Sequence, residues 1–170
     1  DEAESLRRHL VAVDPGNADW RNGLAATLVR LSNLDWQRGN ADRSLARLEE
    51  AEAIFRRLAR DDPPKLLWQE NVADTLVNKG YRKLAAGEDS AAVDAFKEAV
   101  QWRRALVEAS AKADRYRAKL ADALISLGDG VRRTDDDGTT AARPYYAEAL
   151  ALPHAREMDA LIDHLRDASP

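Results

Sequence analysis

The sequence contains no cysteine, 8 glycines and 6 prolines among its 170 residues. The absence of cysteine excludes a disulfide-stabilised scaffold and cysteine-ligated zinc. No apolar run comes near the ~18 residues that a membrane-spanning helix needs. We therefore expect no membrane-spanning segment, and a cytoplasmic protein. The shortage of glycine and proline beside 32 alanines favours long helices over a β-sandwich.

Basic and acidic residues are present in nearly equal numbers. There are 26 basic and 30 acidic residues, a net charge of −4, and this argues against a nucleic-acid partner, which selects for a basic surface. A hydrophobic content of 45% excludes a disordered segment. The sequence starts at Asp1 without methionine or a signal-peptide pattern, so we expect a fragment of a longer protein, or a processed one.

The main signal is a repeat of 48 residues. Trp20, Trp68 and Tyr116 share this spacing. The same spacing relates other apolar positions: Leu24, Val72 and Leu120; Ala25, Ala73 and Ala121; Leu28, Leu76 and Leu124. Self-similarity at a fixed period indicates stacked copies of one supersecondary unit.

Each repeat is predicted to be a helical hairpin, because its apolar residues recur at helical spacing between turn residues. Gly39 ends the first helix, and Asn40 is a candidate cap for the second. Pro63 and Pro64 are expected to stop this second helix and to open the next repeat, since proline suits the start of a helix, and the first helix of that repeat is expected over about 65–86. The register predicts the following division of a single domain: a half repeat over 1–13, repeats over 14–61, 62–109 and 110–153, and a capping helix within 154–170.

The third repeat departs from this plan in its turn, which we expect to run from Thr134 to Thr140 with a two-residue insertion. Pro144 then falls in the first turn of the following helix, where proline is tolerated. With the insertion, three residues align with the second repeat: Ala142, Tyr146 and Ala149 with Ala92, Phe96 and Ala99.

These residues resemble the tetratricopeptide repeat (TPR) family, in a long-helix variant similar to repeat arrays of large bacterial regulatory proteins. Gly80 and Ala92 are predicted to lie where paired helices approach most closely, with Phe96 beside them and Ala99 against the next hairpin. The common TPR unit has about 34 residues, fewer than here. The resemblance implies an all-α, right-handed superhelix, an α-solenoid of three helical hairpins with an N-terminal half-repeat helix and a C-terminal capping helix.

The resemblance also implies a non-catalytic interaction module whose first helices line a concave groove for a peptide or partner segment. Carried over by position, the groove residues are Asn33, Trp36, Asn78, Tyr81, Asp129, Arg132 and Arg133. The alternative is a self-assembly or scaffold domain, a homo-oligomer that stacks through an apolar end bearing Leu6 and Leu10.

No catalytic, cofactor or metal site is predicted. His154 and Glu157 have a spacing that suits one metal, but no second pair of ligands accompanies them. A basic cluster offers a surface for a phosphate backbone or an acidic peptide, or a solvated face paired with nearby carboxylates. The cluster comprises Arg103, Arg104, Arg115, Arg117, Lys119, Arg132 and Arg133, and the carboxylates Glu108, Asp114 and Asp122.

Three of the four tryptophans, Trp20, Trp68 and Trp102, fall on the repeating apolar stripes and are predicted to pack in the core. Trp36 has no aromatic counterpart one repeat later, where Leu84 stands. An aromatic side chain without a packing role in the repeat suits an anchor for a partner.

Overall fold

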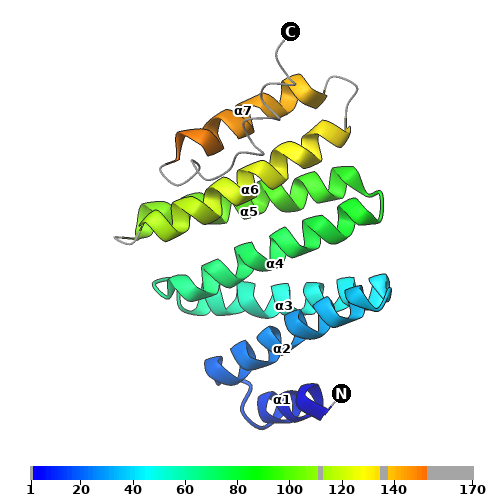
Figure 1. Cartoon of the computed structure of the whole chain (residues 1–170). Helices are drawn as coiled ribbons and strands as arrows, with labels where there is room; N and C mark the ends of the chain where they lie inside the picture. The colour runs from blue at the N-terminus through cyan, green and yellow to red at the C-terminus, as the bar shows by residue number, and fades with distance from the viewer. Residues whose placement is uncertain (1, 111–112, 135–137, 153–170) are drawn as a thin grey trace. The chain divides into compact units, whose positions relative to one another are not determined.

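The computed structural model describes residues 2–110, 113–134 and 138–152. Seven α-helices contain 89% of these residues, and none of them lies in a strand (Figure 1). The predicted all-α class is therefore confirmed. Among the described helices, none combines the length and the apolar character needed to cross a bilayer.

The helices follow one another with short connections, and their bounds match the long pairs that the periodicity predicts. They are α1 (Glu2–Val13), α2 (Ala18–Gln37), α3 (Ala41–Asp61), α4 (Leu66–Ala85), α5 (Asp89–Ala109), α6 (Ala113–Thr134) and α7 (Gly138–Ala151). The expected capping helix falls within 154–170, outside the described residues.

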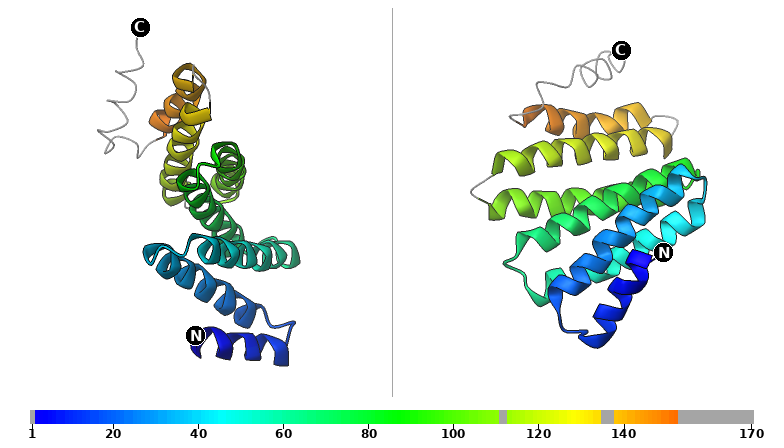
Figure 2. Two further views of the ribbon diagram at one scale, coloured as in Figure 1. Left: turned by 90° about the vertical axis from the view of Figure 1, so that its right-hand side faces the viewer. Right: turned by 60° about the horizontal axis from the view of Figure 1, so that its bottom comes forward.

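Backbone contacts divide the chain into two units, Asp1–Lys79 and Gly80–Pro170, with the boundary inside α4. In unit 1, α1 packs on α2 and α2 packs on α3. In unit 2, α5 packs on α6 and α6 packs on α7. Helices that are neighbours in the sequence therefore pack side by side within each unit, as Figures 1 and 2 show for the coloured ribbons.

The apolar stripes form the core of each unit. Burying a large aliphatic or aromatic side chain contributes about 1.5–3 kcal/mol, so these stripes hold the helices together. Unit 1 buries Leu24, Leu28, Leu48, Phe55, Leu58, Trp68, Val72 and Leu76, and unit 2 buries Phe96, Leu106, Leu120, Leu124 and Tyr146. Of the three predicted core tryptophans, Trp68 is 1% exposed, whereas Trp20 and Trp102 are half-buried.

Small residues stand at the predicted points of close approach. A Cβ added at Gly80 would lie 2.4 Å from Cε1 of Phe96, and one at Gly128 would lie 2.4 Å from Cε1 of Tyr146. In the first repeat the corresponding serine, Ser32, is buried and its Oγ lies 2.9 Å from Oγ of Ser44. Gly80 thus lies against Phe96 and Gly128 against Tyr146, in agreement with the two-residue insertion that aligns these two aromatic residues.

Glycine ends two of the helices as predicted. Gly39 and Gly87 have φ values of 78° and 76°, a left-handed conformation that suits a residue without Cβ. Asn40 occupies the N-cap position of α3, as predicted, but its side chain makes no capping hydrogen bond. A side-chain cap occurs instead at Asn17, whose Oδ1 accepts a hydrogen bond of 3.1 Å from the Trp20 backbone N–H at the start of α2.

Pro63 and Pro64 form the turn before α4, which begins at Leu66, next to the expected helix start near residue 65. Pro144 departs from the prediction. Pro144 lies inside α7 rather than in its first turn, because this helix starts at Gly138, within the segment expected to be a loop. Since proline has no N–H, Pro144 cannot donate to the carbonyl of Thr140, and this weakens the helix at that point.

Candidate functional site

A pocket of about 240 Å³ lies between α2, α3 and α4 of unit 1. We call it the α2–α4 pocket. Its lining residues come from three helices: Ala26, Val29 and Arg30 of α2, Phe55 of α3, and Asn71, Asp74, Thr75 and Asn78 of α4. The pocket thus opens between the first helices of two successive repeats, on the side where the sequence analysis places partner binding.

The floor and the rim of the pocket differ in chemistry. Phe55 is 3% exposed and Ala26 and Val29 are half-buried, so the floor is apolar. The rim carries the carboxamides of Asn71 and Asn78, the Asp74 carboxylate and, from α2, the exposed Arg30 guanidinium. Such a combination can take an apolar side chain while pairing polar groups around it.

Short-range contacts fix the polar rim on α4. The Asn71 amide nitrogen donates to Oδ1 of Asn22 at 3.3 Å, which links α4 to α2. The Thr75 hydroxyl donates to the Asn71 carbonyl at 2.7 Å. Lys79, one residue after Asn78, donates to Oε2 of Glu52 on α3 at 2.9 Å. These contacts hold Asn71 and Thr75 in place on α4 and link α4 to α2 and α3.

The predicted groove residues of unit 1 lie at or beside this pocket. Asn78 lines it, and so does Val29. Asn33 is exposed and Trp36 is half-buried, and they follow Val29 by four and seven residues in α2. Residues at this spacing share one face of a helix, so Asn33 and Trp36 extend the surface from the pocket along α2.

The predicted groove residues of unit 2 make contacts within that unit. Tyr81 is 47% exposed, and its hydroxyl lies 2.7 Å from Oγ of Ser126 on α6. Asp129 accepts a hydrogen bond of 2.7 Å from the Tyr146 hydroxyl. Arg133 donates to Oδ1 of Asp89 at 3.0 Å, and Arg132 is exposed.

These contacts reveal a pairing that repeats along the chain. Tyr81 packs edge-on against Phe96, with ring centroids 5.3 Å apart, and one repeat later Asp129 bonds to Tyr146. At these positions in unit 2, the first helix therefore supplies a partner for the aromatic ring of the second helix. Tyr81 and Asp129 therefore stabilise the packing of the two helices in their own hairpins.

The basic cluster is dispersed among ion pairs. Arg104 reaches Oε2 of Glu148 at 2.7 Å and Arg117 reaches Oδ1 of Asp114 at 2.6 Å. Arg103 is 3% exposed, so it is not part of any surface. Burial raises the pKa of Asp122 above its usual value, although the charge of Arg103 opposes this shift. The pairing with Asp114 was predicted; the burial of Arg103 was not.

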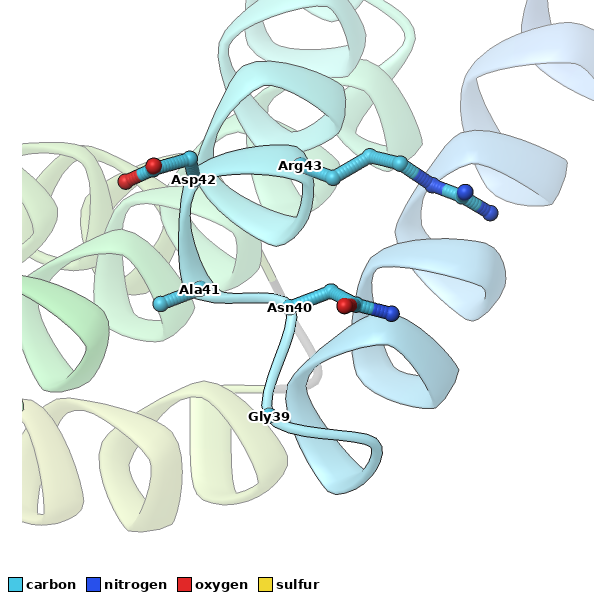
Figure 3. Close-up of a pocket in the computed structure, with 5 residues that line it drawn as sticks. All are labelled: Gly39, Asn40, Ala41, Asp42 and Arg43. Carbon is cyan, nitrogen blue, oxygen red and sulfur yellow. The ribbon is translucent and has the colours of Figure 1, made fainter.

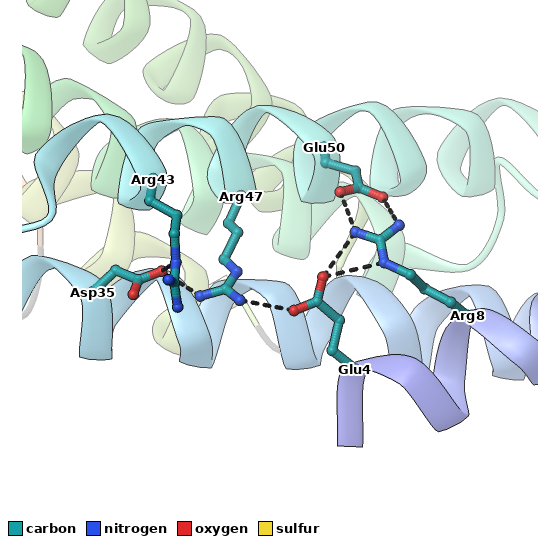
Figure 4. A network of polar contacts seen from close by, with 6 residues as sticks. All are labelled: Glu4, Arg8, Asp35, Arg43, Arg47 and Glu50. Carbon is teal, nitrogen blue, oxygen red and sulfur yellow. Dashed lines mark hydrogen bonds and ion pairs between the residues drawn. The ribbon is translucent and has the colours of Figure 1, made fainter. Parts of the chain in front are cut away.

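An ionic network holds α1, α2 and α3 together in unit 1 (Figure 4). Arg47 of α3 bonds both to Asp35 of α2 and, at 2.8 Å, to Glu4 of α1. Arg8 of α1 donates to Glu4 and, at 2.5 and 2.7 Å, to both carboxylate oxygens of Glu50. The network fixes α2, which carries one wall of the α2–α4 pocket, against α3.

Burial and charge oppose each other at the acids of this network. Burial raises the pKa of Asp35, but the hydrogen bond from Arg43 and the charges of Arg47 and Arg43 outweigh it, so the pKa lies below its usual value. The same balance, with Arg8 and Arg47, lowers the pKa of Glu4. Both acids are therefore held ionised, and the network has a structural role.

A second hollow, of about 380 Å³, lies at the turn between α2 and α3 (Figure 3). It is lined by Gly39, Asn40, Ala41, Asp42 and Arg43, all of them exposed. Figure 3 shows Asp42 pointing away from Asn40 and Arg43, so the polar groups do not converge. We assign no function to this hollow.

Among the described residues, no group of three or more histidine and acidic side chains is placed to hold a metal ion. His154 and Glu157 lie outside the described residues. Comparison of the sequence with protein-family models finds no match, and comparison with curated proteins likewise finds none. The TPR resemblance therefore rests on the repeat within this chain.

Arg30, Asn71 and Asp74 are among the lining residues of the α2–α4 pocket that were not predicted from the sequence. A signal for two of them was present, because Asn71, Asp74 and Asn78 are spaced by three and four residues and so form one polar stripe on α4. Arg30 follows Val29 directly and gave no such signal.

Proposed function

We propose that this chain is a non-catalytic protein-interaction module, and that the α2–α4 pocket binds an extended segment of a partner protein. The observation that carries the proposal is the polar stripe of Asn71, Asp74 and Asn78 facing the apolar floor made by Val29 and Phe55. A TPR-like superhelix of a larger bacterial regulator is part of the same proposal, and the 48-residue repeat supports it.

The chemistry of the rim favours a peptide backbone as the ligand. A carboxamide both donates and accepts hydrogen bonds, so Asn71 and Asn78 match the N–H and C=O groups of an extended chain. Asp74 and Arg30 offer one charge of each sign to the side chains of the partner. The volume of about 240 Å³ suits one apolar side chain on the floor, with neighbouring residues continuing toward Trp36.

A peptide selected on the whole protein from a random library provides the test. Asn78→Ala is expected to weaken its binding about threefold to tenfold, because one hydrogen bond contributes about 0.5–1.5 kcal/mol. Val29→Trp, which fills the floor, is expected to weaken it at least about tenfold. Affinity is measured by fluorescence anisotropy of the labelled peptide.

The matched control is Asn40→Ala, which removes an exposed carboxamide that makes no capping bond at the start of α3. It should leave the affinity unchanged. Circular dichroism verifies that each variant keeps its helices. Wild-type affinity in both Asn78→Ala and Val29→Trp would refute the assignment of binding to this pocket.

Self-assembly is a second candidate, favoured by the surface of α1. Leu6 and Val13 are 59% and 64% exposed, and α1 contains no buried residue. If α1 stacks on a second copy, the sedimentation coefficient should rise with concentration, and Leu6→Glu should abolish the rise. Leu34→Glu, at another exposed leucine on α2, serves as the control. A concentration-independent monomer excludes this role.

A further inference from the structure

A third hollow of unit 1 has the composition of a small-molecule site. It lies where α1, the turn after it and the start of α2 meet α3, and its volume is about 320 Å³. We call it the α1–α3 pocket. It shares no lining residue with the α2–α4 pocket. Ligand pockets commonly have volumes of roughly 300–1,000 Å³, so this one accepts a compact ligand.

The walls of the α1–α3 pocket are mostly apolar. Val11 and Pro15 stand on one side, and Ala53 and Ile54 of α3 stand on the other. Val11 and Ile54 are half-buried, and Ala53 and Pro15 are exposed. Apolar area that a ligand covers here is removed from water, which favours binding.

The remaining lining residues are charged: Glu50, Arg21 and Arg57. Glu50 is already paired, since Arg8 donates to both of its oxygens at 2.5 and 2.7 Å. Its negative charge is therefore balanced before any ligand arrives. The two arginines determine the charge that the pocket presents.

Both arginines lie close to the same carboxylate, that of Asp61. Arg21 is 9% exposed and donates to Oδ2 of Asp61 at 2.8 Å, while Nε of Arg57 stays 3.8 Å from the same oxygen. The hydrogen bond from Arg21 lowers the pKa of Asp61 against the effect of burial, and the charges of Arg57 and Arg60 lower it further. Positive charge therefore exceeds negative charge at this end of the pocket.

We propose that the α1–α3 pocket binds a small organic monocarboxylate with an apolar body. The carboxylate binds the Arg57 guanidinium, which is 64% exposed in its side chain and lies beyond hydrogen-bond distance of Asp61. A guanidinium can donate two parallel hydrogen bonds to a carboxylate. The body of the ligand lies against Val11 and Ile54. The site is independent of the partner-binding function proposed above.

Calorimetric titration of the whole protein with octanoate tests this proposal. Saturable binding is expected, and octan-1-ol, which has the same chain without the charge, should bind at least about tenfold more weakly because a charged hydrogen bond is lost. Arg57→Gln should weaken octanoate binding about tenfold as well. Arg60→Gln removes the same charge from the same helix but not from the lining, and should change the affinity by less than about twofold.

Methyl NMR provides a readout that does not depend on the variants. Octanoate should shift the methyl signals of Val11 and Ile54 and leave those of Val29 unchanged. The proposal is overturned if octanol binds as tightly as octanoate, if Arg57→Gln binds like the wild type, or if neither methyl pair responds. Asn78→Ala should not alter octanoate binding, so failure here and failure of the peptide site are distinguishable.

Discussion

Gly80→Ala is expected to lower the free energy of unfolding by about 2–3 kcal/mol, at the upper end of the cost of overpacking. The added Cβ would lie 2.4–2.7 Å from three atoms of the Phe96 ring, and Phe96 is fully buried and cannot swing away. The gain in helix propensity, up to about 1 kcal/mol, offsets only part of this cost. Urea denaturation followed by circular dichroism measures the change.

The first repeat indicates how the clash can be relieved. There the small residue is Ser32 rather than glycine, and Leu48 stands where Phe96 stands in the second repeat. Gly80→Ala combined with Phe96→Leu should therefore be more stable than the sum of the two single effects predicts, by at least about 1 kcal/mol. Strict additivity of the two changes would show that the contact does not determine the cost.

Tyr146→Ala is expected to cost about 3–5 kcal/mol, because it leaves a cavity where a ring that is 2% exposed fills the space beside Gly128. Tyr146→Phe keeps the ring and removes only the hydrogen bond of 2.7 Å to Asp129. We expect that variant to lose about 1 kcal/mol. A similar loss of unfolding free energy in Tyr146→Ala and Tyr146→Phe would contradict a packing role for the ring.

The hydroxyl of Tyr146 should also give a pH dependence. Burial, followed by the hydrogen bond to Asp129 and its negative charge, raises the pKa of Tyr146 above its usual range. The folded state thus holds the proton more tightly than the unfolded chain, whose tyrosines titrate near pH ~10. The stability advantage of the wild type over Tyr146→Phe should be complete at pH 8 and shrink above pH ~10. An advantage that grows with pH would contradict this assignment.

The packing of the hairpins could be predicted from the sequence because it is local and periodic. Gly80 and Gly128 recur one repeat apart, each followed by an aromatic residue in the second helix, and each contact forms within one hairpin. The left-handed turns at Gly39 and Gly87 follow from glycine in the same register. The start of α7 was missed because the sequence Gly-Thr-Thr favours a turn. In the structure these residues form the first turn of α7.

The candidate sites were predicted less completely, because they depend on contacts between repeats. Arg47 bonds to acids 12 and 43 residues away, and no spacing rule selects these two among 30 acidic residues. Asn78 was predicted from its position in the repeat, whereas Arg30 enters the pocket from a neighbouring helix. The α1–α3 pocket was missed for the same reason, since its charge depends on which arginine Asp61 pairs with.

Backbone amide NMR of the whole labelled protein, with and without a library-selected peptide, tests the proposed function most directly. Binding in the α2–α4 pocket predicts the largest shift changes at Val29, Asn71, Asp74 and Asn78, with smaller ones at Asn33 and Trp36. Shift changes that leave these residues unaffected and cluster on the outer face of α3 or on α1 would contradict the account.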